Sequence, residues 1–133
     1  MFEWKDCYRV QINSIDGQHQ NLFRLAANLH AALQAGQSQA IMTQLLDRLL
    51  QYTQVHFAQE ERLMQNAKYP EFAAHKAQHE EFIAEVVRLQ KEFKDGRMAI
   101  SLTMLQFLKR WLAKHIMQSD QKYAPYLKAK AVA

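Results

Sequence analysis

The stretch that decides the fold runs from His56 to His79 and reads HFAQEERLMQNAKYPEFAAHKAQH. It contains two pairs of potential metal ligands, His56 with Glu60 and His75 with His79, and the members of each pair are four residues apart. Four residues make about one turn of α-helix, so both side chains of a pair project from the same helix face. Residues 66–70 between the pairs read NAKYP, which indicates a loop. The stretch therefore predicts two antiparallel helices that each turn two ligands inward.

The composition of the whole chain is typical of a helical protein. The 133 residues include only 3 glycines and 2 prolines, and 49% of them are hydrophobic. Few helix breakers and long periodic runs indicate an all-α fold of a single domain, residues 1–133. We predict an antiparallel up-down four-helix bundle with an irregular N-terminal arm and a short C-terminal helical tail.

The hydrophobic periodicity also predicts where the helices lie. We expect an arm at residues 1–17, helices at about 18–35, 38–65, 70–94 and 99–120, and a tail at 121–133. Ser38 is an expected N-cap, Pro70 can occupy a first helical turn, and Phe2 and Trp4 should anchor the arm. The apolar core positions expected in the helices, in chain order, are Leu22, Ala26, Leu29, Leu33, Leu45, Leu49, Tyr52, Leu63, Phe72, Phe82, Val86, Leu89, Phe93, Met104, Leu108 and Trp111.

Charge and hydropathy exclude several classes of partner. The net charge is +4, but the basic residues are scattered among acidic ones and form no dense block, so we predict no nucleic-acid partner. No apolar run approaches the roughly 20 residues that span a bilayer, and the first ten residues, MFEWKDCYRV, contain no secretory hydrophobic region. The single cysteine, Cys7, fits a reducing compartment, and we predict a cytoplasmic location.

Three further potential ligands lie outside the deciding stretch. His19 and His115 fall on the inward faces of the first and fourth predicted helices. Asp120 does not, because five residues separate it from His115, which is about 140° of rotation on an ideal α-helix. Either Asp120 lies on the surface or a wide helical turn carries it inward, and such turns often mark functional sites.

So many polar side chains on core faces need a partner. A buried, unpaired imidazole or carboxylate costs about 1–3 kcal/mol or more. One such histidine is more often hydrogen-bonded within the core than bound to metal, but five of the 6 histidines on inward faces favour a shared metal site. His30 lies about 16 Å along the helix axis from His19, which excludes it from that site. We expect Glu61, Glu80 and Glu81 on solvated faces.

The number of ligands predicts more than one ion. Imidazoles with carboxylates suit iron, zinc, manganese or copper, and seven ligands exceed what one ion takes. If both carboxylates bridge two ions, the five histidines divide three and two. With one bridging oxygen added, one ion has six ligands and the other has five and an open position. Iron is the metal whose paired ions can together give dioxygen two electrons.

The sequence resembles the hemerythrins, and among them the single-domain bacteriohemerythrins. The resemblance covers nearly the whole chain and includes Trp4 and the segments IDGQH (15–19), YTQVHFAQEERLM (52–64), YPEFAAHKAQHEEF (69–82) and WLAKHIMQSD (111–120). These segments contain all seven potential ligands in order. The departures lie elsewhere: Gln11, where a small residue is expected, and the free Cys7.

The resemblance implies a non-haem centre of two iron ions joined by an oxo or hydroxo bridge. It assigns His75, His79 and His115 to the saturated iron, His19 and His56 to the open iron, and Glu60 and Asp120 to bridging positions. It also implies that dioxygen binds end-on to the open iron as a hydroperoxide. We therefore predict a carrier or store of dioxygen rather than an enzyme.

Other functions stay open at this point. A sensor would couple oxygen binding to a protein contact, a di-iron redox enzyme would act on peroxide or nitric oxide, and a structural bundle would hold zinc. An oxygen-consuming protein that receives the oxygen remains an unidentified candidate partner. Apolar neighbours of the ligands, Leu22, Phe57 and Ile116, should keep the expected oxygen pocket dry.

Overall fold

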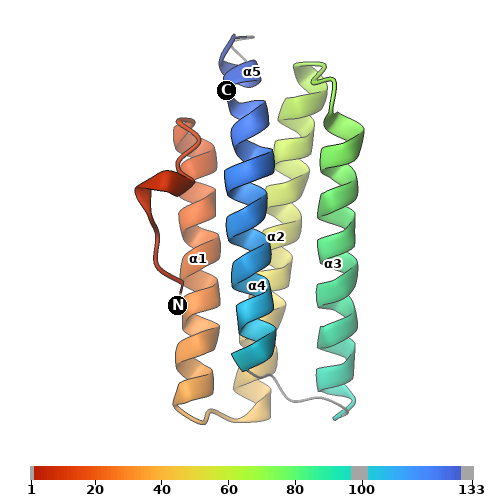
Figure 1. Ribbon diagram of the computed structural model, residues 1–133. Helices are drawn as coiled ribbons and strands as arrows, with labels where there is room; N and C mark the ends of the chain where they lie inside the picture. The colour runs from red at the N-terminus through yellow and green to blue at the C-terminus, as the bar shows by residue number, and fades with distance from the viewer. Residues whose placement is uncertain (1, 97–101, 130–133) are drawn as a thin grey trace.

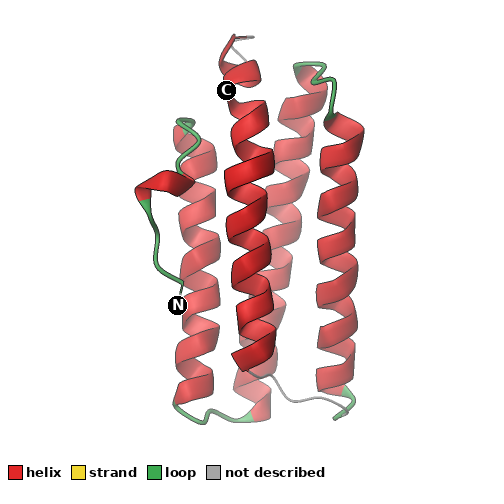
Figure 2. Cartoon of the chain, viewed as in Figure 1, coloured by secondary structure: helices red, strands yellow, loops and turns green. Residues whose placement is uncertain are grey.

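The computed structural model describes residues 2–96 and 102–129. The helices form four long segments that pack side by side, and the fourth segment runs from α4 through a π-helix to α5 (Figure 1). The described residues form helices and no strand, which confirms the predicted all-α bundle (Figure 2). The helices are α1 (Asn13–Gln34), α2 (Gln39–Asn66), α3 (Phe72–Lys94), α4 (Leu102–Lys114), the π-helix η2 (His115–Asp120) and α5 (Gln121–Ala129), with a short 3₁₀ helix η1 (Asp6–Tyr8) in the arm.

Short connections make the neighbouring helices antiparallel. Residues 35–38 join α1 to α2 at one end of the bundle, and residues 67–71 join α2 to α3 at the other end (Figure 1). Ser38 caps α2 as predicted, because its hydroxyl accepts a hydrogen bond from the Ile41 amide at 3.3 Å. The predicted start of the fourth helix, near residue 99, lies outside the described residues.

Two predicted helix starts were wrong. The first helix begins at Asn13 and not near residue 18, so only the residues before it belong to the arm. Asp16 explains the early start, since its carboxylate accepts a hydrogen bond from the Val10 amide at 2.8 Å and fastens the arm to the first helical turn. The third helix begins at Phe72, because Pro70 lies in the turn that precedes it.

Two hydrophobic clusters fill the interior. The large cluster occupies most of the bundle and includes Leu29, Leu46, Leu89 and Leu105. The small cluster lies beyond it along every helix and includes Ile15, Met64, Tyr69, Tyr123 and Leu127. Along each helix, the potential metal ligands lie where the residues of one cluster give way to those of the other.

Six predicted core positions pack against the two clusters but lie at their edge. Leu33, Leu45, Tyr52, Leu63, Phe72 and Trp111 are only partly buried. Phe23 and Leu46, which the sequence did not identify as core, are buried, and so is Phe57, an expected apolar neighbour of the ligands. The predicted core positions form one line along each helix. The buried face is wider than this line, because each helix in a bundle contacts two neighbouring helices.

The arm packs against the bundle through the expected aromatic anchors. Phe2 is buried, and the ring of Trp4 contacts the rings of Tyr8 and Phe23 edge-on at centroid distances of 5.6 and 5.8 Å. Gln121 holds the same arm from α5, where its amide donates to the Cys7 carbonyl at 2.6 Å. Among the described helices, none is both long and apolar enough to cross a membrane.

Candidate metal centre

A layer of polar side chains crosses the bundle between the two hydrophobic clusters. α1 contributes one member, α2 and α3 contribute two each, and η2 contributes two. None of the side chains is more than marginally exposed, with fractions from 0% to 5%. The structure thus brings together all seven residues that the sequence singled out: His19, His56, Glu60, His75, His79, His115 and Asp120. His30 lies outside both groups of potential ligands that these residues form.

The π-helix η2 explains how Asp120 joins this layer. It begins at His115 and ends at Asp120, so these two residues are its first and last. Hydrogen bonds in a π-helix run between residues i and i+5, and the wide turn brings residue i+5 back over residue i. Of the two interpretations open at the sequence level, the structure therefore has the wide turn, and Asp120 is 1% exposed.

The potential ligand atoms form two groups that share both carboxylates. Within each group, one ligand atom from every residue lies within 4.8 Å of the others. One group contains three histidines and the other contains two. We call them the three-histidine group, which consists of His75, His79, His115, Glu60 and Asp120, and the two-histidine group, which consists of His19, His56, Glu60 and Asp120.

Asp120 extends one oxygen toward each group. Its Oδ1 lies 2.9 Å from His75 Nε2 and 3.1 Å from His115 Nε2, and its Oδ2 lies 3.1 Å from His19 Nε2. Glu60 also spans both, since its Oε1 lies 3.1 Å from His56 Nε2 and 3.6 Å from His79 Nε2. Donor atoms bound at about 2.1 Å and at right angles to each other lie about 3.0 Å apart. The observed separations therefore suit donor atoms around common ions.

Most of these inward-facing atoms have no hydrogen bond. Within the described part of the chain, the unbonded buried atoms include the Nε2 atoms of His19, His56 and His75, the Oε1 of Glu60 and both carboxylate oxygens of Asp120. The short contacts of these atoms lack hydrogen-bond geometry. Each atom therefore loses its hydrogen bonds to water on burial and gains none within the protein. A cation that accepts their lone pairs would remove this cost, and the residues present fit such a cation.

The electrostatics of the layer show how charge is distributed without a cation. Burial lowers the pKa of His19, but the carboxylates of Asp120 and Glu60 outweigh burial and raise it to about 10. Burial, together with the neighbouring His115 and His75, lowers the pKa of His79 to about 3. Burial would raise the pKa of Asp120, and contacts with His115, His19 and His75 instead hold it well below its ordinary value. The carboxylates are thus ionised and attract positive charge.

Three imidazoles are fixed from outside by hydrogen bonds that their Nδ1 atoms donate. His79 donates to Glu61 Oε2 at 2.9 Å, His115 to Gln78 Oε1 at 2.9 Å, and His56 to Gln18 Oε1 at 2.5 Å. A proton held on Nδ1 leaves the Nε2 lone pair free to face the centre. A fourth bond comes from α5, where the buried Tyr123 hydroxyl donates to Glu60 Oε2.

Sequence reasoning missed these four outer residues. Glu61 was expected on a solvated face, and it is instead partly buried against His79, with a side chain 19% exposed. The available signal was sequence proximity, since Glu61 follows Glu60 directly and Gln18 precedes His19 directly. Proximity alone does not reveal which ring nitrogen of a neighbouring helix each side chain reaches.

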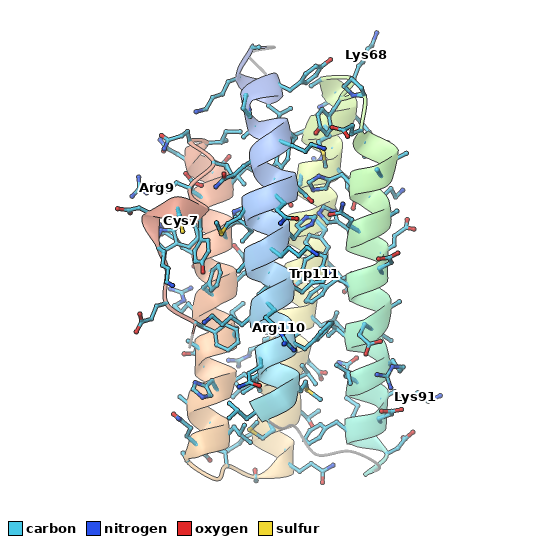
Figure 3. The ribbon with its side chains drawn as sticks, in the orientation of Figure 1. Cys7, Arg9, Lys68, Lys91, Arg110 and Trp111 are labelled. Atoms are coloured by element: carbon cyan, nitrogen blue, oxygen red, sulfur yellow. The ribbon has the colours of Figure 1, made fainter. Side chains whose placement is uncertain are left out.

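Aromatic rings complete the surroundings of the imidazoles. The Phe57 ring stacks on the His79 ring with centroids 3.7 Å apart and an angle of 1° between the planes. Trp111, which lies between α4 and α3 in Figure 3, stacks on His115 at 4.5 Å and on Phe82 at 4.0 Å. These contacts restrict ring rotation on the three-histidine side.

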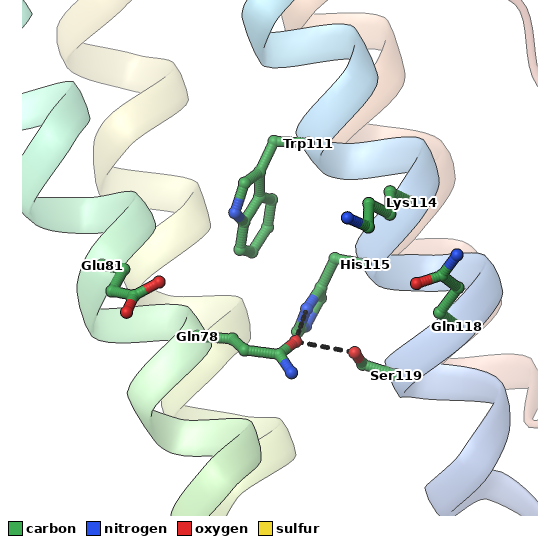
Figure 4. Close-up of a pocket in the computed structure, with 7 residues that line it drawn as sticks. All are labelled: Gln78, Glu81, Trp111, Lys114, His115, Gln118 and Ser119. Carbon is green, nitrogen blue, oxygen red and sulfur yellow. Dashed lines mark hydrogen bonds between the residues drawn. The ribbon is translucent and has the colours of Figure 1, made fainter.

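A polar cavity of about 390 Å³ opens beside the three-histidine group (Figure 4). Gln78 lines this cavity, and its Oε1 accepts hydrogen bonds from His115 and, at 2.6 Å, from the Ser119 hydroxyl. The charged residues Glu81 and Lys114 line the same cavity. His115, which also lines this cavity, is only 5% exposed.

Comparisons with known proteins find similar sequences and structures over nearly the whole chain. The family model described as "Hemerythrin HHE cation binding domain" matches residues 10–127. A bacteriohemerythrin of Stenotrophomonas maltophilia is 40% identical over 126 residues, which is 95% of this chain and 81% of that protein. A bacteriohemerythrin of Methylococcus capsulatus is 34% identical and covers 92% of each chain. The solved structure described as wild-type hemerythrin superposes with a TM-score of 0.89 at 32% identity, over 94% of this chain and 96% of that one.

Proposed function

This chain belongs to the hemerythrin family, and on that premise we propose that it binds dioxygen reversibly, as a carrier or store, at a non-haem centre of two iron ions. The family and the clustered ligands make it a hemerythrin-type protein that binds iron and oxygen. The finer parts of the proposal are the number of irons, their oxo or hydroxo bridge, and the end-on binding of oxygen as a hydroperoxide.

The observation that carries the proposal is the unequal sharing of the ligands. The three-histidine group supplies five residues and the two-histidine group supplies four, with both carboxylates common to the two groups. We assign His75, His79 and His115 to one iron, His19 and His56 to the other, and bridging positions to Glu60 and Asp120. With one bridging oxygen the second iron has one open position, which suits a small ligand at one end of the pair.

The chain's own residues would favour carriage over oxidation of a substrate. Leu22, Phe57 and Ile116 are each at most 4% exposed and belong to the large cluster, next to the layer of ligands. Such apolar neighbours exclude water and the protons that would release bound oxygen as peroxide. The five imidazoles and two carboxylates also carry less negative charge than the carboxylate-rich di-iron bundles, whose anionic ligands stabilise high-valent iron better.

An absorption spectrum tests this function most simply. Anaerobically reduced, iron-loaded protein should be nearly colourless, gain a charge-transfer band on exposure to air, and lose it again when oxygen is removed. Rapid irreversible oxidation, with turnover of added peroxide or nitric oxide, would instead support the redox-enzyme alternative. Stoichiometric zinc and no colour at all would support a structural bundle.

The place of action and the partners are also proposals. We propose a cytoplasmic protein, since its one cysteine, Cys7, is free and exposed. Its partner is dioxygen, and an oxygen-consuming protein is a candidate recipient. A pull-down with the oxygenated and oxygen-free forms would test for a recipient, and equal capture of both forms would contradict oxygen-dependent delivery.

A further inference from the structure

The two ligand groups differ in the hydrogen bonds that support them from outside. In the three-histidine group, the Nδ1 of His79 donates to a carboxylate, that of Glu61, at 2.9 Å. In the two-histidine group, the Nδ1 of His56 donates to a neutral amide, that of Gln18, at 2.5 Å. This amide is itself held in place, because its nitrogen donates to Gln59 Oε1 at 2.6 Å. Each group thus has one imidazole that donates to an amide, His115 to Gln78 and His56 to Gln18, and only the three-histidine group also has one that donates to a carboxylate.

We propose that Glu61 is a positioning residue that makes the three-histidine group the tighter metal site of the pair. The inference rests on the proposed function only in requiring that the two groups hold metal ions. A hydrogen bond to a carboxylate is stronger than one to an amide and increases the basicity of the ligating nitrogen. His79 belongs to the three-histidine group alone, so the added donor strength reaches one ion of the pair and not the other.

The surroundings of the Glu61–His79 contact make it effective. The side chains of Glu61 and His79 are 19% and 1% exposed, so the carboxylate keeps some contact with water while the ring has almost none. The contact lies under a largely apolar groove of about 320 Å³ between α2 and α3, lined by Ile83 and Ala84 among others. A low local dielectric strengthens a hydrogen bond of this kind.

Phe57 fixes the orientation that this hydrogen bond requires. Its ring lies parallel to the His79 ring at 3.7 Å, which prevents the imidazole from turning away from Glu61. The Nε2 of His79 then lies 2.9 Å from the Nε2 of His115 and faces the shared centre. Glu61, Phe57 and His79 therefore form one unit that sets both the tautomer and the direction of this ligand.

The same negative charge should also influence an iron in this group. A nearby anion stabilises the more highly charged oxidised state of a metal relative to the reduced state. The iron held by His79 should therefore be oxidised more easily than it would be beside a neutral acceptor, and hydrogen bonding outside the ligands is an established means of such tuning. Loss of this charge should raise the reduction potential of the pair.

Metal titration of the metal-free protein tests the inference without oxygen. Cobalt(II) should bind wild-type protein in two steps of different affinity. Glu61→Gln keeps a hydrogen-bond acceptor and removes the charge, and it should weaken the tighter step about tenfold while the weaker step changes less than about threefold. Glu61→Ala removes the acceptor as well and should weaken the tighter step by up to about a hundredfold.

Glu80→Gln is the matched control. Glu80 lines the same groove and directly follows His79, so its substitution removes the same charge from the same surface. It should leave both cobalt steps unchanged, because the hydrogen bond to His79 comes from Glu61. Equal weakening by Glu61→Gln and Glu80→Gln would show a general charge effect and overturn the inference, as would equal loss in both steps.

A substitution in the two-histidine group tests the same inference from the other side. Gln18→Glu places a carboxylate on His56 and should narrow the difference between the two cobalt steps. In the iron-loaded protein, Glu61→Gln should also raise the reduction potential. A protein that forms a normal oxygen adduct but shows no effect of Glu61→Gln contradicts this inference alone. A protein that shows the cobalt effects but binds no oxygen contradicts the proposed function alone.

Discussion

The large hydrophobic cluster and the layer of seven ligands occupy the same four helices but are stabilised differently. In the cluster, side chains such as Leu29 and Leu105 are fully buried, and each gains free energy simply by leaving water. In the ligand layer, side chains such as Glu60 and His19 are buried as completely, yet several of their polar atoms have lost water without gaining a hydrogen bond. One region is therefore stable by its own packing, whereas the other needs metal to offset the cost of its burial.

The largest expected effect comes from removing a shared ligand from the ligand layer. Glu60→Ala removes a carboxylate that both groups share, so the protein should lose at least one metal per chain together with the oxygen adduct. Metal analysis and the absorption spectrum would measure both losses. His30→Ala is the control and should leave metal content and spectrum unchanged, and a normal adduct in Glu60→Ala would reject the assignment.

A substitution in the large cluster should give the opposite pattern. Leu105 is 0% exposed, and Leu105→Ala should lower the free energy of unfolding by about 2–5 kcal/mol. Metal content should stay near that of the wild type, because Leu105 contributes no ligand. Urea unfolding with parallel metal analysis separates the two effects. Leu102, which is 48% exposed, supplies the control, and its substitution by Ala should cost less than about 0.5 kcal/mol.

The contrast also shows which parts of the site the sequence could predict. Helical spacing alone placed His56 beside Glu60 and His75 beside His79, because residues four apart share a helix face. It could not decide the position of Asp120, since the π-helix that carries this residue inward is a local departure from the period on which the prediction depends. The resemblance to hemerythrins supplied what periodicity left open.

The outer hydrogen bonds of the site were beyond prediction for a different reason. Whether Glu61 reaches water or His79 depends on the rotation of α3 relative to α2, which hydrophobic patterns fix only roughly. The early start of α1 was not predicted because an Asp-Gly pair such as Asp16–Gly17 usually indicates a turn, whereas the Asp16 carboxylate here binds the arm and the helix accommodates the glycine. Side-chain hydrogen bonds between distant segments leave little trace in composition or period.

The stability of the metal-free protein should depend on pH through the histidines of the ligand layer. Folding raises the pKa of His19 from 6.5 to about 10, so its contribution to stability is complete below pH about 6.5 and is lost as the pH rises toward 10. Folding lowers the pKa of His79 from 6.5 to about 3, so that contribution is complete above pH about 6.5 and is lost as the pH falls toward 3. Stability should therefore be greatest near pH 6.5.

Urea midpoints of the metal-free protein between pH 5 and pH 9 would measure this profile. His19→Gln should flatten its alkaline side, because the raised pKa belongs to that imidazole. Protein loaded with metal should show a flatter profile over the same range, since bound imidazoles do not take up protons. An identical profile in the two forms would show that the layer is not occupied by metal.

The smallest expected effect lies in the arm, outside both regions. Gln11 has a φ of 67°, in the left-handed region that favours glycine. Gln11→Gly should relieve this strain and raise the free energy of unfolding by about 0.5–1 kcal/mol, without change in metal content. Thermal unfolding of matched samples would detect the gain, and a loss of stability would indicate that the Gln11 side chain makes a compensating contact.

Iron counted per chain after anaerobic reconstitution tests the central claim most directly. Two groups that share Glu60 and Asp120 predict two irons per chain in the wild type, and fewer in any variant that removes a shared carboxylate. A preparation that takes up no iron, or that holds a single ion at saturation, would contradict a paired centre.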